Sequence, residues 1–306
     1  SIADRLGRGV TSGNNDTIGN SGSITVNVTA GDLLFSGGTD SLTWAQLGHG
    51  GYLVDDNHSG DIAVMVSGDI TFTAGTDGAA AGAGNASFAQ IGHGGYQSRG
   101  DHSGEINVTG GSITLTGSID TDATDGGTDT NNGHAQIGHG GYDSDNPNQN
   151  SSAYDGNIGN SGNIFVTSTV GDVIIEAGND YRSFAQIGHG GNQTSGSQSG
   201  AVEVTSAGSV ELYASGARGA PTDGWNSREG YALIGHGGSE TGGGDLGTRD
   251  VDNADGDNDP TTGVDNHIKV RAQDELIMLG GQAYRGFTQI GHGGRLHRGT
   301  KDGHIS

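Results

Sequence analysis

Hydrophobic and polar residues alternate in short runs along this chain. Residues 62–66 read Ile-Ala-Val-Met-Val and residues 70–74 read Ile-Thr-Phe-Thr-Ala, with Gly and Asp standing before each run. Alternation with a period of two over four to eight residues is typical of a β-strand with one buried face. A helix would instead repeat its apolar residues every three or four positions, and no segment of the chain shows that spacing. The pattern therefore predicts an all-β protein.

A seven-residue phrase close to Ala-Gln-Ile-Gly-His-Gly-Gly recurs six times, each time after a pair of alternating runs. The steps between its neighbouring histidines are 44, 46, 50, 47 and 56 residues. Self-similarity at a nearly constant period indicates a stacked array of repeats and not a globule with a single core. The histidines of the phrase are His49, His93, His139, His189, His236 and His292.

Each repeat contains three alternating runs, the last of which leads into the histidine phrase. The inward positions are mainly β-branched, which suits strands, and the three prolines lie between the runs, where they cannot interrupt a ladder. We therefore predict one parallel β-solenoid of about six triangular rungs of roughly 46 residues, with three short strands per rung. Within the array 1–306, the expected rungs are approximately 22–52, 60–96, 104–142, 162–192, 200–239 and 266–295, with 1–21 as the end of a preceding degenerate rung and 296–306 as the start of a next rung.

Neither end of the array resembles a capping repeat. Residues 3–9 read as a degenerate histidine phrase, and residues 302–306 read as the start of another first strand. An uncapped solenoid end exposes unpaired backbone groups. We therefore expect copies of the chain, or neighbouring repeats, to stack end to end.

The composition narrows the choice of partners. A hydrophobic content of 30% is low for a globule but sufficient for a solenoid, whose rungs each bury only a narrow strip. The formal charge of −23 argues against nucleic acid, because phosphate binding needs a cationic surface, and it makes divalent cations the natural counterions. Cysteine is absent, so thiolate metal sites are excluded, and no apolar run is long enough for membrane insertion.

A Ser-Gly-acid-Ile cadence, as in residues 59–62, opens the first strand of several repeats, and Gly-Asp or Gly-Ser opens the second. Over essentially the whole chain this cadence resembles the β-helical shafts of large bacterial surface proteins of the filamentous haemagglutinin type. The resemblance implies an elongated right-handed parallel β-helix, an extracellular place on the bacterial surface, and a role in adhesion or the biofilm matrix. The rungs here are longer than expected, and the secretion-domain sequence typical of such proteins is not visible.

The six histidines should align into a file along one corner. In one interpretation they form a structural ladder, in which each ring stacks on its neighbour and one ring nitrogen donates to a backbone carbonyl. In the other they bind a transition metal. Imidazoles about 4.8 Å apart would crowd several metal ions together, which favours the structural ladder.

An aromatic file precedes the histidine phrase, interrupted by His134. Stacked rings would stabilise adjacent rungs, and a stripe that binds sugars is the alternative. A glutamine file beside it is most simply an amide ladder. The aromatic ladder contains Trp44, Phe88, Phe184, Tyr231 and Phe287.

Two acidic loops share the pattern Asp-x-Asp-x-x-Asp-Gly. Carboxylates at short intervals around a Gly turn can converge on Ca²⁺, which takes six to eight oxygen ligands. A solvated acidic loop is the simpler alternative. The candidate Ca²⁺ ligands are Asp120, Asp122 and Asp125 in one loop and Asp250, Asp252, Asp255, Asp257 and Asp259 in the other.

No segment places a nucleophile beside a base, so we do not expect an enzyme. The sequence instead favours a structural segment of an extracellular bacterial fibre or giant adhesin shaft, held by stacked side-chain ladders and by Ca²⁺ in the acidic loops. The alternative is a module that binds surface glycan or another cell-surface ligand on a β-helical scaffold.

Overall fold

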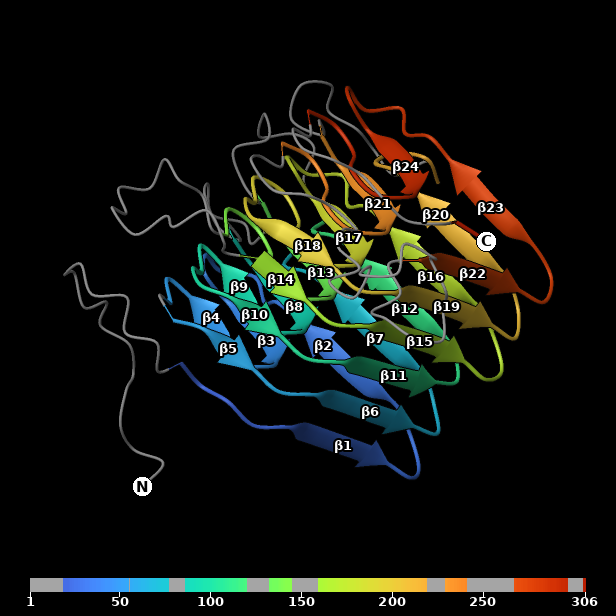
Figure 1. The fold of residues 1–306 in the computed structure, drawn as a ribbon. Helices are drawn as coiled ribbons and strands as arrows, with labels where there is room; N and C mark the ends of the chain where they lie inside the picture. The colour runs from blue at the N-terminus through green and yellow to red at the C-terminus, as the bar shows by residue number, and fades with distance from the viewer. Residues whose placement is uncertain are drawn as a thin grey trace, which may run out of the picture.

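The structure, a computed structural model, describes residues 19–54, 56–76, 86–119, 132–144, 159–218, 229–240, 267–296 and 305–306. It confirms the predicted parallel β-solenoid. Three six-stranded parallel sheets run along the axis, and each rung contributes one strand to each sheet (Figure 1). No helix of the described residues could cross a membrane.

The three strands of a rung follow one another in the chain. The first sheet contains β1 (Ile24–Val28), β6 (Ile62–Val66), β11 (Ile106–Gly110), β15 (Ile164–Ser168), β19 (Val202–Ser206) and β22 (Ile268–Ala272). The second contains β2 (Leu33–Ser36), β7 (Ile70–Thr73), β12 (Ile113–Thr116), β16 (Val173–Glu176), β20 (Val210–Tyr213) and β23 (Leu276–Leu279). The third contains β3 (Trp44–Leu47), β8 (Phe88–Ile91), β13 (His134–Ile137), β17 (Phe184–Ile187), β21 (Tyr231–Ile234) and β24 (Phe287–Ile290).

Equivalent residues of neighbouring rungs pair directly. Ile62 lies between Ile24 and Ile106, and the same register continues through the sheet. Because side chains alternate across a strand, this register places the β-branched residues of all rungs in one continuous core. Ile305 pairs with Ile268 beyond the last complete rung, as the first strand of a further rung would.

Two further sets of short strands were not expected from the sequence. After the histidine phrase, β4 (Gly50–Tyr52) pairs with β9 (Gly94–Tyr96), and isolated bridges continue this pairing through later rungs. A separate sheet contains β5 (His58–Ser59), β10 (His102–Ser103), β14 (Gly159–Ser161) and β18 (Ser197–Ser199). Figure 1 shows these strands stacked beside the third sheet.

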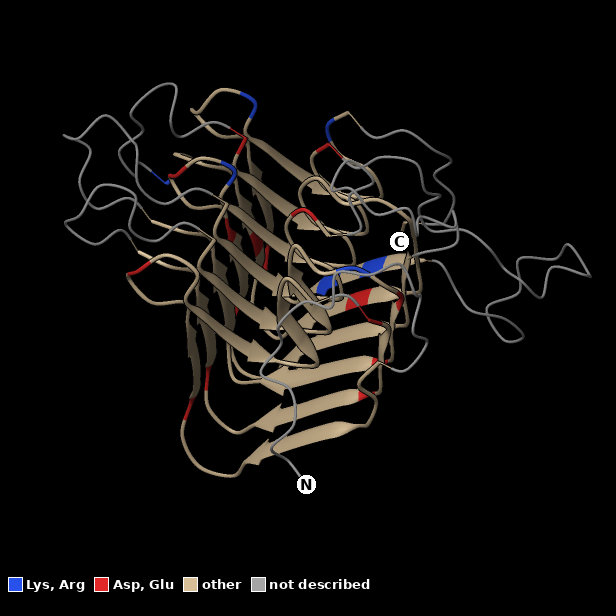
Figure 2. Ribbon diagram, turned by 90° about the vertical axis from the view of Figure 1, so that its left-hand side faces the viewer, with Lys and Arg blue, Asp and Glu red and all other residues tan. Residues whose placement is uncertain are grey.

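The returning chain changes the environment of the third sheet. In β6 and β11 buried and less buried residues alternate, whereas all four residues of β8 and β17 are buried. The third sheet therefore has two covered faces, and it holds the histidine phrase between the core and the returning chain. Charged residues lie mainly at turns and on the last rungs (Figure 2).

Candidate functional site

The six histidines of the phrase form one continuous stack. Neighbouring rings are nearly parallel, and their centroids lie 4.8–4.9 Å apart at every step. The backbone N–H of His93 donates to Nδ1 of His139 at 2.9 Å, and the same bond joins each adjacent pair. The strand register places the rings one rung apart, so each histidine links its rung to the preceding one.

The other ring nitrogen closes the rung on itself. Nε2 of His93 lies 2.8 Å from the carbonyl oxygen of Gly60, where the first strand of the same rung begins. Equivalent contacts join His139 to Gly104 at 3.0 Å and His236 to Gly200 at 2.8 Å. Since Nδ1 accepts a hydrogen bond, Nε2 must carry the proton and donate to the carbonyl. The geometry therefore requires a neutral imidazole in a single tautomer.

Burial keeps these imidazoles neutral. It lowers the pKa of His93 to about 4, with a further contribution from His49, while the Gly60 carbonyl and Asp61 oppose the shift. Burial, aided by His93, lowers the pKa of His139 to about 3. The pKa of His236 falls to about 3 for the same reason. At neutral pH these side chains are uncharged hydrogen-bond connectors.

The arrangement leaves the inner histidines poorly suited to metal. In His93 and His139 both ring nitrogens are used by backbone groups, so neither nitrogen has a lone pair left for a metal ion. Across the described residues, no group of three His, Asp or Glu side chains is placed to hold a metal ion.

The glutamines beside the histidines also connect rungs. Nε2 of Gln90 donates to the carbonyl oxygens of Gly138 and Gly140 in the next rung, at 2.9 and 3.1 Å. Gln46, Gln136 and Gln186 repeat this pair of bonds, and Leu233 interrupts the file. The close approach explains the glycines of the phrase, because a Cβ at Gly92 would collide with the backbone of Gly138.

The aromatic file is continuous and mostly internal. Phe88, His134 and Phe184 are completely buried, with ring centroids 4.9 and 4.8 Å apart, and the stack continues through Tyr231 to Phe287. Trp44 in the first rung, which is 43% exposed, stacks on Phe88 at 5.8 Å. The inner rings therefore present no face on which a sugar could stack.

Carboxylates at the corners cap backbone amides of the next rung. Oδ1 of Asp69 accepts from the N–H of Ser112 at 2.8 Å, and Oδ1 of Asp172 accepts from the N–H of Ser209 at 2.7 Å.

The eight aspartates predicted from the sequence as Ca²⁺ ligands all lie outside the residues that the structure describes. They are Asp120, Asp122, Asp125, Asp250, Asp252, Asp255, Asp257 and Asp259.

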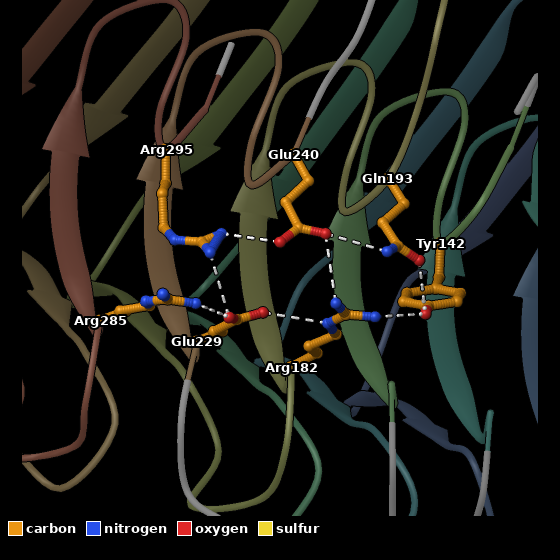
Figure 3. A network of polar contacts seen from close by, with 7 residues as sticks. All are labelled: Tyr142, Arg182, Gln193, Glu229, Glu240, Arg285 and Arg295. Atoms are coloured by element: carbon orange, nitrogen blue, oxygen red, sulfur yellow. Dashed lines mark hydrogen bonds and ion pairs between the residues drawn. The ribbon is translucent and has the colours of Figure 1, made fainter.

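A polar network that the sequence did not suggest spans four rungs beside the aromatic file (Figure 3). Glu229, only 3% exposed, accepts from Arg182 at 3.0 Å and Arg285 at 2.9 Å, and pairs with Arg295 at 3.3 Å. Glu240 contacts Arg182 at 3.2 Å and Arg295 at 2.8 Å. Burial raises the pKa of Glu229, but hydrogen bonds from the arginines outweigh it and the pKa is lowered.

The network extends toward the earlier rungs through neutral groups. Arg182 donates to the hydroxyl of Tyr142 at 3.1 Å, and this hydroxyl donates to Oε1 of Gln193 at 2.8 Å. The amide of Gln193 in turn donates to Glu240 at 2.9 Å. This chain of contacts places each charged group against a partner on an adjacent rung.

The network residues occupy repeated positions that are visible only when the rungs are aligned on their histidines. Arg182, Glu229 and Arg285 each stand seven residues before the histidine, in the left-handed region with φ of 55°, 68° and 64°. Gln193 and Glu240 stand four residues after it, with φ of 57° and 60°. Every rung has left-handed residues at both positions, so this backbone is a property of the repeat and not of one site.

Comparison with known proteins identifies no relative of this chain. No protein-family model matches the sequence, and neither the curated proteins nor the solved structures contain a match.

Proposed function

We propose that this chain is a structural segment of an extracellular bacterial fibre or giant adhesin shaft. One observation carries the proposal: the histidine at the corner is used in the same way at every step from His49 to His292. In an enzyme or receptor, the functional side chains converge on one place and face a ligand. Here the repeated side chains face the neighbouring rung, and their donors and acceptors hold the column together.

The geometry also supports axial assembly as the partner interaction. Rungs that pair in register through backbone and side-chain bonds can add further rungs of the same kind without a new type of contact. We therefore propose copies of the chain, or neighbouring repeats, as end-to-end partners. Ca²⁺ in the acidic loops is part of the same proposal, as a stabiliser of the column.

Electron microscopy of the purified protein, with and without EDTA, tests this function. We expect filaments or extended rods with an axial repeat of about 4.8 Å. Loss of the filaments in EDTA would support Ca²⁺ in the acidic loops, and their persistence would overturn the Ca²⁺ part. Short single particles under both conditions would overturn axial self-assembly.

The alternative function, glycan or cell-surface binding, is tested on the exposed aromatic group of the first rung. A glycan array with a defined hit that is lost in Trp44→Ala would favour a binding module. Phe88→Leu, which alters a buried ring of the same file, is the matched control for a general effect on folding. If the array gives no hit and filaments are present, the binding alternative is rejected and the structural role is retained.

A further inference from the structure

The polar network alternates in charge from rung to rung. Arg182 lies in the fourth rung, Glu229 and Glu240 lie in the fifth, and Arg285 and Arg295 lie in the sixth. The rungs share nearly the same core residues, so the core alone would accept one rung as readily as another. The ion pairs centred on the buried Glu229 are instead selective, because a like charge placed against this carboxylate would be unfavourable. The network therefore specifies which kind of rung lies beside which.

The acidic fifth rung is enclosed by arginines on both sides. Glu229 receives Arg182 from the preceding rung and Arg285 and Arg295 from the following one. Among the described residues, Arg285 and Arg295 form ion pairs only with the fifth rung. Their side chains are 42% and 17% exposed. The sixth rung therefore carries Arg285 and Arg295, and no acidic residue among those described covers these arginines on the side away from the fifth rung.

A shallow hollow, open to solvent, lies on this face. Its volume is about 390 Å³, and Arg285, Phe287, Gln289 and Arg295 line it together with three small neighbours. Phe287 stacks on Tyr231 at 4.9 Å and ends the aromatic file. Nε2 of Gln289 donates to the carbonyl of His292 in its own rung, whereas inner glutamines also reach the next rung. The residues equivalent to Arg285, Phe287 and Gln289 in the fourth rung each contact the following rung.

We propose that this face receives an acidic rung, that is, a β-strand segment of the same repeat with a carboxylate seven residues before or four residues after its histidine. Such a segment would add to the edge of β24, stack its aromatic ring on Phe287 and place a carboxylate against Arg285 and Arg295. The fifth rung of this chain, with Glu229 and Glu240 at these two positions, is an example of such a segment.

The inference deepens the proposed axial assembly and rests on it for the kind of occupant. Its probe is a synthetic peptide of residues 229–240, Glu-Gly-Tyr-Ala-Leu-Ile-Gly-His-Gly-Gly-Ser-Glu, which carries both carboxylates. One control peptide has Gln in place of both Glu residues. A second control is the basic segment 285–296, Arg-Gly-Phe-Thr-Gln-Ile-Gly-His-Gly-Gly-Arg-Leu.

Fluorescence anisotropy of labelled peptides against the intact protein measures the selectivity. We expect the acidic peptide to bind about tenfold or more tightly than its Gln counterpart, because charge-assisted hydrogen bonds distinguish them, and we expect no binding of the basic peptide. Rising salt should weaken the acidic peptide most. Arg285→Gln and Arg295→Gln should each abolish the preference, while Arg271→Gln, on an exposed position of β22 in the same rung, should keep it.

Equal affinity of the acidic and Gln peptides, or binding of none of the three, would overturn the inference. The two proposals fail separately. Filaments without peptide selectivity would leave the structural function and remove the acidic rung. Selective peptide binding without filaments would leave the acidic rung as the preferred occupant of this face and remove axial self-assembly.

Discussion

The backbone N–H of His139 donates to Nδ1 of His189 at 3.0 Å, and the two rings stack with centroids 4.8 Å apart. This bond exists only while the His189 ring is neutral, because protonation turns the accepting nitrogen into a donor. A protonated file would also place positive charges one rung apart in a buried corner. The corner of the solenoid is therefore stable only above the pH at which its imidazoles take up protons.

We predict that the protein loses stability as the pH falls from about 6.5 toward 4. The pKa of His93 is lowered to about 4 and that of His139 to about 3, against 6.5 for an unperturbed histidine. The unfolded chain therefore binds more protons than the folded one in this interval, and each such histidine costs about 1.4 kcal/mol per pH unit. Guanidinium denaturation at pH 7, 6 and 5, where ordinary carboxylates stay charged, should show the decline. A constant midpoint across these pH values would contradict it.

His139→Ala should destabilise the column by about 3 kcal/mol. The change removes two hydrogen bonds and leaves the N–H of His93 and the carbonyl of Gly104 buried without their partner. His292→Ala is the matched control, because His292 lies in the last complete rung and is partly exposed. Urea denaturation should show a clearly smaller loss for the control. Because His292 also accepts an inter-rung bond, from the N–H of His236, equal losses would show that the deeper burial of the His139 bonds adds little.

His134→Phe should stabilise the protein by about 1–2 kcal/mol. The ring of His134 is buried between Phe88 and Phe184, and neither of its nitrogens has a well-formed hydrogen bond. Phenylalanine keeps the stack and removes the cost of burying an imidazole. The reverse change in an adjacent rung, Phe88→His, should destabilise. Thermal denaturation of both variants checks this, and a lower midpoint for His134→Phe would contradict it.

Glu229→Gln should cost about 3–5 kcal/mol, since it leaves three arginines without their shared, nearly buried carboxylate. Glu275→Gln, which alters an exposed residue before β23, is the control and should change stability by less than about 0.5 kcal/mol. Chemical denaturation at pH 7 measures both. A loss for Glu229→Gln no larger than that of the control would show that the network contributes little.

The fold was predictable because the same information is repeated in every rung. Alternation alone places Ile62 and Val64 inward, and the histidine spacing aligns them with Ile106 and Val108. A register error of one residue would turn every inward side chain outward, so the repeat leaves a single solution. The returning chain was missed because Gly94 and its neighbours have no side-chain pattern that a periodicity argument can detect.

Because the returning chain was not predicted, the burial of the outer face of the third sheet was not predicted either. Alternation places Phe88 and Gln90 opposite Ile91, which suggests an exposed face, yet the glycine-rich return covers both residues. The ion network was hidden by distance, since Arg182 and Glu229 lie 47 residues apart in the chain. Counting positions from each histidine would have found it, because Arg182, Glu229 and Arg285 then fall into one column with alternating charge.

The side-chain bonds of the corner join each rung to its immediate neighbours, as the step from His93 to His139 shows. A pull along the axis would therefore detach the end rung first and leave the rest of the column intact. One rung of about 46 residues, drawn out to full extension, adds roughly 15 nm of length. The molecule should yield in a series of similar steps and absorb work at each one, instead of failing in a single event.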